Sequence, residues 1–341
     1  MIKDIKFDFN DISLIPTLMS EIGSRSEINI HDEHGKLPLF VSPMDTVIDE
    51  KNHNLFYDLG FNVCIPRQTR LTKSEQIPEY FISYGLDEIE MRIKNKKDLP
   101  PRILIDVANG HSKRVVEVSR EIKRDYDVEL MVGNIANPKT YSLYANIGVD
   151  YVRCGIGAGH ACTTSANSSI HYPMASLIKE CAELKELYDH KTKIVADGGF
   201  KNYDDIIKAL GLGADYVMLG NIINKSVESC GKNYIYKDDK YLQIEDKDAL
   251  DFFKDGVDIY KMFRGMSTKE VQKKWGKKEL RTSEGIVKIN KVEYNIGGWV
   301  NNFQDYLKSC MSYQGKSKLN NFIGLADFVF VSQNAYLRFN K

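Results

Sequence analysis

The sequence lacks several features that would assign it to a specialised class of protein. No apolar run approaches the roughly 20 residues needed to cross a bilayer. The charged start, MIKDIKFDFND, has no apolar stretch of the kind found in signal peptides. Lys and Arg number 47 and Asp and Glu number 47, so no net charge favours nucleic acid or an anionic membrane as a partner. These absences predict a soluble, cytoplasmic chain.

Paired cysteines and proline-rich segments are also missing. The six cysteines occur without CxxC pairs, which argues against a zinc site or a disulfide framework and for a reducing compartment. Only 9 of the 341 residues are Pro and 43% are hydrophobic, so the chain is not of a disordered type. A (β/α)8 barrel takes roughly 250 residues, so one barrel domain over 1–341 with insertions accounts for the length.

Short β-branched runs alternate with amphipathic helices, which is typical of parallel βαβ units. We predict a helix over 172–187, a second helix near 298–311 and a strand over 326–332. The predicted strands of the central sheet are continuous apolar runs, as expected for strands buried on both faces: 37–43, 102–110, 129–135, 151–157, 193–199 and 216–222.

The ends of these runs decide between two α/β architectures. A Rossmann domain needs one glycine-rich turn that opens a helix, whereas a barrel places polar residues at the carboxyl ends of many strands. Small or polar residues end nearly every run here, for example Ser42, Asn109 and Gly199. The pattern therefore favours an α/β fold of the (β/α)8 TIM-barrel type.

Residues 224–294 differ in composition from the rest of the chain. They are rich in Lys, Asp and Tyr, and the segments 234–244 and 284–296 are typical of strands. Because the apolar content is low, we predict a flap or insertion within the barrel and not a separate domain.

The segment GIGAGHACTT, residues 155–164, carries the clearest chemical signal. A dinucleotide GxGxxG would need glycine where His160 stands, so that motif is broken. The remaining interpretation is a flexible loop that brings the thiol of Cys162 over a substrate. Cys64, Cys154 and Cys181 lie within strand or helix patterns and are predicted to be small buried hydrophobes.

With these residues in view, the chain resembles the IMP dehydrogenase/GMP reductase family along nearly its whole length. GIGAGHACTT is similar to the catalytic loop of that family. Further matches follow in the same order along the chain: SPMDTV (42–47), IDVANGHS (105–112), ADGG (196–199), MLGN (218–221) and RGMS (264–267).

Within the family, several segments resemble the reductase more than the dehydrogenase. DVANG, SRSE (24–27), RTSEG (281–285) and SCMSYQG (309–315) have the reductase form, and no regulatory CBS insertion is expected between strand ends 44 and 106. The arginine of RGMS is closer to the dehydrogenase form. The alternative left open is therefore an IMP dehydrogenase that lacks its CBS domain and oxidises IMP with NAD.

The resemblance implies a reaction in which GMP and NADPH give IMP, NADP and ammonia. Cys162 would form a covalent thioimidate at carbon 2 of guanine, with Thr164 and Glu284 as the proton relay for the departing amine. The residues implied to bind the nucleotide are Ser42, Met44, Asp197, Gly199, Gly220, Asn221, Gly265, Met266 and Ser267.

The resemblance further implies residues for the cofactor and for a cation. Asp106, Ala108, Asn109, Arg281 and Arg67 would face NADPH, and Ser24, Arg25, Ser309 and Tyr313 would reach it from a neighbouring subunit of a homotetramer. Backbone carbonyls of Gly157, Gly159 and Cys162 resemble a loop that holds a monovalent cation, K⁺.

Some positions depart from the family pattern. Ser165 stands where Arg or Lys is usual, and SSIHYP (168–173) replaces a glycine-bearing segment, which leaves the cation site open. Asn221 replaces a glycine, and Phe263 replaces a tyrosine of the dehydrogenases. These changes predict a divergent member, for which a deoxy- or modified guanine nucleotide is an alternative substrate. A nucleotide-binding barrel without catalysis is the alternative from a different class, and the presence of Cys162, Thr164 and Glu284 together argues against it.

Overall fold

A computed structural model describes residues 5–67, 69, 77–266, 268–275, 282 and 285–339 of the chain. Its centre is a closed barrel of eight parallel strands in the order β2-β3-β4-β5-β6-β7-β8-β9, in which β2 pairs with β9. The barrel strands are Leu39–Val41, Asn62–Ile65, Phe81–Tyr84, Arg102–Asp106, Glu129–Ile135, Tyr151–Cys154, Lys193–Asp197 and Tyr216–Leu219. The predicted (β/α)8 barrel is confirmed.

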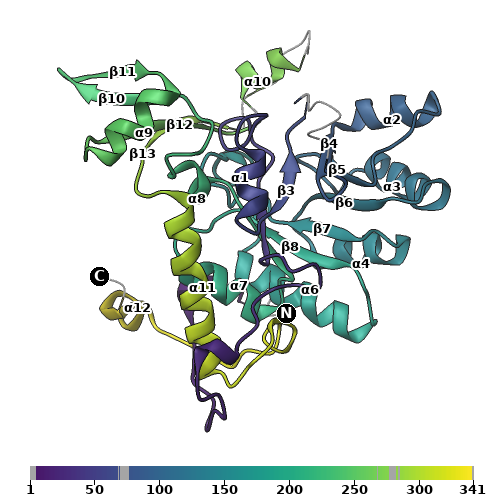
Figure 1. Ribbon diagram of the computed structural model, residues 1–341. Helices are drawn as coiled ribbons and strands as arrows, with labels where there is room; N and C mark the ends of the chain where they lie inside the picture. The colour runs from purple at the N-terminus through teal and green to yellow at the C-terminus, as the bar shows by residue number, and fades with distance from the viewer. Residues whose placement is uncertain are drawn as a thin grey trace.

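Helices surround the barrel and alternate with its strands (Figure 1). They are α1 (His53–Asp58), α2 (Leu86–Lys94), α3 (Lys113–Asp125), α4 (Pro138–Ile147), α5 (Thr164–Ser168), α6 (Met174–Leu187), α7 (Tyr203–Leu212), α8 (Asn221–Asn224) and α11 (Ile296–Tyr313). Within the described ranges no helix is both long and apolar enough to cross a membrane.

Local sequence explains where these helices begin, end and pack. In α3, Val115, Val118 and Ile122 are buried at helical spacing while the charged residues between them face outward. Pro138 occupies the first turn of α4 and the Asn137 side chain accepts a hydrogen bond from Lys139 N at 2.9 Å. The same helix ends at Gly148, whose φ of +86° a glycine adopts without strain.

Two layers of apolar side chains form the core. One lies between barrel and helices, and the other fills the barrel interior with Phe40, Cys64, Phe81, Leu104, Met131, Tyr151, Val195, Tyr216 and Met218. Phe40 contacts the rings of Phe81, Tyr151 and Tyr216 at centroid distances of 5.1–6.1 Å. Cys64, Cys154 and Cys181 are fully buried, as the sequence predicted, and burial raises the pKa of the Cys64 thiol.

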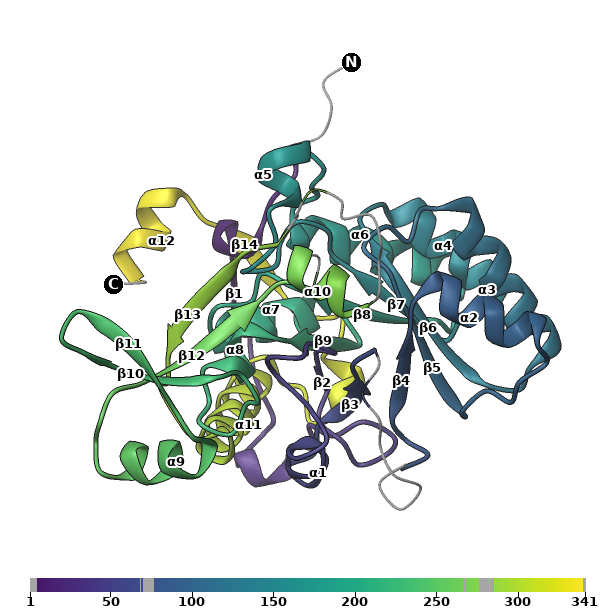
Figure 2. The same ribbon diagram turned by 90° about the horizontal axis from the view of Figure 1, so that it is seen from above.

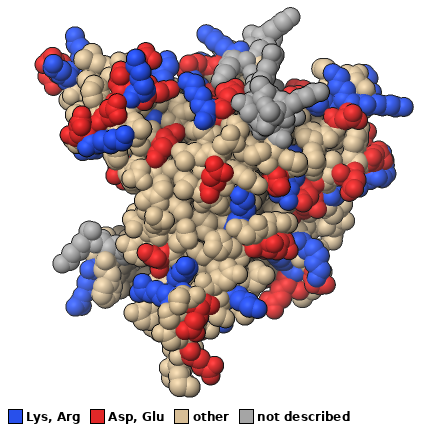
Figure 3. All heavy atoms as spheres, in the orientation of Figure 1, with Lys and Arg blue, Asp and Glu red and all other residues tan. Residues whose placement is uncertain are grey.

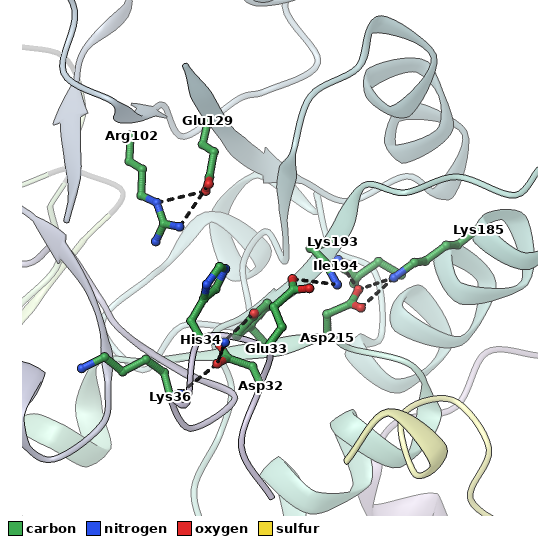
Figure 4. A network of polar contacts seen from close by, with 11 residues as sticks. Asp32, Glu33, His34, Lys36, Arg102, Glu129, Lys185, Lys193, Ile194 and Asp215 are labelled. Carbon is green, nitrogen blue, oxygen red and sulfur yellow. Dashed lines mark hydrogen bonds and ion pairs between the residues drawn. The ribbon is translucent and has the colours of Figure 1, made fainter. Parts of the chain in front are cut away.

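Ion pairs and polar contacts gather at the amino ends of the strands (Figure 4). Arg102 at the start of β5 pairs with Glu129 at the start of β6, with Nε and Oε2 3.0 Å apart. Asp215, just before β9, accepts from Lys185 Nζ at 2.6 Å and from the backbone N of Ile194 at 2.7 Å. Because the opposite end of such a barrel usually carries the chemistry, we interpret this end as structural.

The segment predicted as a flap contains a four-stranded antiparallel sheet in the order β11-β10-β12-β13. Its strands are Asn233–Lys237, Lys240–Ile244, Ile259–Arg264 and Val287–Lys291, with α9 (Asp246–Lys254) and α10 (Lys269–Lys274) between them. Despite the low apolar content, a small core of Val227, Ala249, Ile259 and Val292 is buried beneath the sheet. Seen from above, α10 lies over the end of the barrel (Figure 2).

Several predicted boundaries differ from those observed. The predicted strand 151–157 ends at Cys154, because Gly155 and Gly157 turn the chain with φ of +140° and +80°. The segment 234–244 is a hairpin of two strands, and the strand predicted over 284–296 is confined to Val287–Lys291. The sequence pattern also missed β3 and β4, which have four residues each.

The two ends of the chain meet on the outside of the barrel. β1 (Ile12–Leu14) pairs antiparallel with β14 (Phe328–Phe330), and α12 (Gln333–Phe339) follows. On the face of the molecule in Figure 3, acidic and basic residues are interspersed around a broad uncharged area. Among the residues that the structure describes, that face therefore carries no extended patch of one sign.

Candidate active site

A cavity of about 650 Å³ opens at the carboxyl ends of the barrel strands and extends under the flap. Its lining comes from the segments that follow β2, β5, β7, β8 and β9, together with β12 and α10. Sixteen of the predicted site residues line it: Arg67, Ser42, Met44, Asp106, Ala108, Asn109, Gly157, Gly159, Cys162, Thr164, Asp197, Gly199, Gly220, Asn221, Gly265 and Met266. Glu284, Arg281 and Ser267 lie outside the described residues.

The loop after β7 carries the candidate nucleophile. Cys162 is half-buried and lines the cavity, and its Sγ lies 3.3 Å from the hydroxyl oxygen of Thr164. The loop can turn so tightly because Gly155 has no side chain: a Cβ there would lie 2.1 Å from the carbonyl oxygen of Asp197. A thiol next to a hydroxyl at the wall of a cavity is placed to react with a bound molecule.

The flap is hydrogen-bonded to this loop through the main chain. Ile286 N donates to the carbonyl of Ala161 at 3.0 Å, and Gly285 forms an isolated antiparallel bridge with Cys162. Gly265 N donates to the Ile286 carbonyl at 3.1 Å. Flap and loop therefore form a continuous backbone layer over the cavity.

Two of the carbonyls predicted to hold a monovalent cation accept hydrogen bonds from within the loop. Ser165 Oγ donates to the carbonyl of Gly157 at 3.0 Å, and Cys162 N donates to the carbonyl of Gly159 at 2.9 Å. Each oxygen keeps one lone pair, so the donor set is only partly open to a cation. The loop is closed by its own hydrogen bonds, and these residues fit a cation poorly.

A buried arginine links the carboxylates of two strand ends. Arg153 on β7 is 6% exposed; its Nη1 donates to Asp106 Oδ1 at 2.7 Å and its Nη2 to Asp197 Oδ2 at 2.8 Å. Burial lowers the pKa of Arg153, but the charges of Asp197 and Asp106 outweigh this and the net direction is upward. Asn134 Nδ2 also donates to Asp197 Oδ2, at 2.7 Å.

These contacts leave one carboxylate oxygen of Asp197 available. All of the hydrogen bonds that Asp197 accepts through its side chain from described residues go to Oδ2, and the residue lines the cavity. Oδ1 is thus placed to accept from hydroxyls of a ligand. The sequence analysis missed Arg153 and Asn134, although a charged or amide residue inside an apolar strand run is a signal that could have found them.

The ends of β8 and β9 supply main-chain donors. Gly198 and Gly199 have φ of +101° and +88°, and no described residue accepts a hydrogen bond from the N–H of Gly199 or of Asn221. Consecutive free N–H groups in such turns form anion-binding concavities. At the neighbouring strand, Gly220 lies against Ser42 and Met44: a Cβ there would be 3.0 Å from the Met44 sulfur.

The opposite side of the cavity carries a cation over an aromatic ring. The Arg67 guanidinium lies 3.9 Å from the ring centroid of Trp275, which follows α10. A Cβ on Gly85 would lie 2.1 Å from Arg67 Nη2, so a side chain at this position would displace the guanidinium. Arg67 Nε is buried without a hydrogen-bond partner, as expected for a donor that meets an anionic ligand. Trp275 is a further lining residue that the sequence analysis missed.

Four predicted cofactor residues lie away from the cavity. Ser24 caps the short 3-10 helix Arg25–Glu27, and Ser309 and Tyr313 belong to the last turns of α11. The two segments are neighbours, because Ser20 Oγ donates to the Ser312 carbonyl at 2.7 Å and Thr17 N donates to the Tyr313 carbonyl at 2.9 Å. The side chain of Tyr313 is 64% exposed. Within one chain these four residues do not join the site.

Comparison with known proteins agrees with this geometry. The family model described as the IMP dehydrogenase / GMP reductase domain matches residues 86–338. The chain is 27% identical to GMP reductase 2 of Homo sapiens, over 97% of this chain and 95% of that protein. It is 29% identical to GMP reductase 1 of Mus musculus (97% and 96%) and 29% identical to GMP reductase of Phytophthora infestans (97% and 92%).

Proposed function

The chain belongs to the IMP dehydrogenase/GMP reductase family, and from this premise we propose that it reduces GMP, or a closely related guanine nucleotide, to IMP with NADPH and releases ammonia. The observation that carries the proposal is the half-buried Cys162 thiol on a cavity that has main-chain N–H donors on one side and, on the other, an arginine whose Nε has no hydrogen-bond partner. The proteins to which the chain is similar over almost their whole length are named GMP reductases.

The nucleotide would lie along the ends of β8, β9 and β2. Asp197, held by Arg153 and Asn134, would accept hydrogen bonds from the ribose hydroxyls through Oδ1. The N–H groups of Gly199, Gly220 and Asn221 would meet the phosphate. Ser42, Met44, Gly265, Met266 and Ser267 would line the nucleotide. A purine bound in that place would present its carbon 2 to the Cys162 loop.

The covalent step uses Cys162 as the thiolate. Its sulfur adds to carbon 2 of guanine, the bond from carbon 2 to the exocyclic nitrogen breaks, and the amine leaves as ammonia once protonated. A thioimidate remains, and the carbon–sulfur bond breaks after a hydride is added to carbon 2. Thr164, 3.3 Å from the sulfur, and Glu284, which directly precedes Gly285 in the sequence, would relay the proton to the amine.

NADPH, when bound, supplies the hydride. The side of the cavity proposed for NADPH contains Asp106, Ala108, Asn109 and Arg67, and the Nε of Arg67, which has no hydrogen-bond partner, suits an anionic cofactor. Arg281 is proposed to lie beside it. K⁺ has no part in the proposed mechanism, because Ser165 Oγ and the backbone N of Cys162 already donate hydrogen bonds to the carbonyls of Gly157 and Gly159.

We also propose a homotetramer in which neighbouring subunits complete the cofactor site. Ser24, Arg25, Ser309 and Tyr313 lie together on the outside of the chain, so their reach toward NADPH requires a second subunit. All six cysteines are free thiols, which supports a reducing compartment such as the cytoplasm.

The decisive assay follows absorbance at 340 nm. GMP with NADPH should lower the absorbance, and IMP with NAD should leave it unchanged; the reverse pattern would identify an IMP dehydrogenase. Cys162→Ala should remove turnover while it retains IMP binding, whereas Cys310→Ala, at a half-buried thiol outside the cavity, should keep the activity. Near-normal turnover of Cys162→Ala would exclude the covalent mechanism. The same assay with deoxyguanosine monophosphate separates the alternative substrates.

A further inference from the structure

The flap strand β13 runs beside the end of the cavity that is lined by Gly199, Gly220 and Asn221, and one of its lysines, Lys288, is the cross-strand partner of the lining residue Phe263. At its start, Ile286 N is bonded to the Ala161 carbonyl at 3.0 Å, next to His160. Four residues later, Asn290 Nδ2 donates to Asn221 Oδ1 at 3.0 Å. Lys288 is midway between these two anchors. Since a strand advances roughly 3.3 Å per residue, Lys288 is about two residue steps from each anchor, between the Cys162 loop and the end of β9.

The alternation of the strand decides which way Lys288 points. Side chains two residues apart share a face, so Lys288 lies on the face of Asn290, which contacts Asn221. Its direct partner across the sheet is Phe263, a buried residue of the cavity lining. Lys291 lies on the other face, is exposed and pairs with Asp258 at 2.8 Å. Lys288 is therefore the lysine of β13 that faces the barrel.

The electrostatics agree with this placement. His160 lines the cavity, and its pKa is lowered first by burial and then by the charge of Lys288, ahead of Lys201 and Lys225. Lys225 is paired with Glu293 at 2.8 Å, whereas Lys288 has no carboxylate partner among the described residues. Lys288, a half-buried residue, is thus left to pair with a ligand.

The cavity needs such a cation if its ligand is an anion. The formal charges of Arg153, Asp106 and Asp197 amount to one net negative charge near the ribose end. Main-chain N–H groups at Gly199 and Asn221 supply hydrogen bonds but no full charge. A phosphate carries nearly two negative charges near neutral pH, and a buried anion without a cation is costly.

We propose that Lys288, with His160 beside it, recognises the 5′-phosphate of the substrate from the flap, and that this contact makes the site select nucleotides over nucleosides. The inference rests on the proposed function and adds a specificity-determining residue to it. It also gives the flap a role in binding: the strand that covers the Cys162 loop contacts the phosphate of the same substrate molecule.

Calorimetric titration with IMP and with inosine tests the proposal, because the two ligands differ only in the phosphate. Lys288→Met should weaken IMP binding about ten- to a hundredfold, as expected for the loss of a charged hydrogen bond, and leave inosine binding unchanged. Lys291→Met removes the same charge from the other face of β13 and should change neither affinity. Lys288→Arg should recover most of the IMP affinity.

An equal loss for IMP and inosine in Lys288→Met, or no loss, would overturn the inference. A measurement on the unaltered protein gives an independent answer: IMP should protect Lys288 from acetylation, followed by mass spectrometry, and inosine should not. Protection by neither ligand, or equal protection by both, would also overturn it. Failure of the proposed function would look different, since the unaltered protein would then bind IMP and yet not oxidise NADPH with GMP.

Discussion

Replacement of Arg153 by Met should destabilise the barrel and weaken nucleotide binding together. The guanidinium is the cation between Asp106 and Asp197, at 2.7 and 2.8 Å, and its side chain is 7% exposed. Without it, Asp106 loses this ion pair, and Asp197 keeps the hydrogen bond from Asn134 at 2.7 Å. Both carboxylates would then stand in a poorly solvated place close to each other.

The size of the effect follows from that geometry. Removal of one partner of a buried ion pair costs about 3–5 kcal/mol. The side chains of Asp106 and Asp197 are 15% and 14% exposed, so water from the cavity reaches them and the lower value of about 3 kcal/mol applies. For a chain of this size, that loss should lower the melting temperature by about 4 °C. The affinity for IMP should fall about tenfold as Asp197 loses its fixed orientation.

Thermal melts and IMP titration of two variants check this reasoning. Arg102→Met serves as the control, because Arg102 is also a barrel-strand arginine in an ion pair but lies at the amino end, away from the cavity. It should lower the melting temperature without changing IMP affinity. A second substitution, Asp106→Asn, added to Arg153→Met should recover part of the stability, since one unpaired charge is removed. A melting temperature within 2 °C of the original, or equal affinities in the two arginine variants, would refute the argument.

Three other outcomes are expected. Glu284→Gln should slow ammonia release by about 10²–10⁴-fold in single-turnover experiments and leave hydride transfer to the thioimidate nearly intact, because Gln cannot act as an acid; equal slowing of both would contradict the proton relay. Burial lowers the pKa of Lys261 from 10.5 to about 8. Between those pH values the unfolded chain therefore binds more protons than the folded chain. The free energy of unfolding should rise with pH across this window by about 3 kcal/mol more in the unaltered protein than in Lys261→Met. Parallel pH profiles of the two proteins in urea unfolding would contradict this. The activity should change little when KCl is exchanged for N-methylglucamine chloride, whereas Ser165→Ala, which frees the Gly157 carbonyl, should gain stability from K⁺ in thermal melts; strong K⁺ dependence of the unaltered protein would show that the loop needs the ion.

Much of the barrel could be predicted because its strands are continuous apolar runs that end in polar or glycine residues. That pattern follows directly from burial on both faces and from the position of the loops. Cys162 was singled out by its loop and Asp197 and Asp106 by the resemblance to the family, and all three line the cavity. β3 and β4 were missed, although with four residues each they are as long as β7 and β9, which were predicted. Their partners in the barrel, not their own sequence, define them as strands.

The residues that sequence reasoning missed act through contacts between segments distant in the chain. Arg153 and Asn134 lie in strand runs, and their partner Asp197 is 44 and 63 positions away. Trp275 meets Arg67 only because α10 lies over the barrel end. The flap was predicted from its composition, but its small core depends on residues as far apart as Val227 and Val292. No local pattern contains that information.

The contact between the flap and the Cys162 loop is made by main-chain atoms on both sides. A Cβ on Gly265 would lie 2.7 Å from the Ala161 carbonyl oxygen, so the two backbones touch with no side chain between them. Such a main-chain contact fixes the position of the backbone but does not depend on which side chains most flap residues carry. An engineer could therefore exchange the outward residues Val287, Ile289 and Lys291 to attach a label or alter solubility without displacing the thiol. A side chain at Gly265, in contrast, would press on the Ala161 carbonyl and displace the loop that carries the nucleophile.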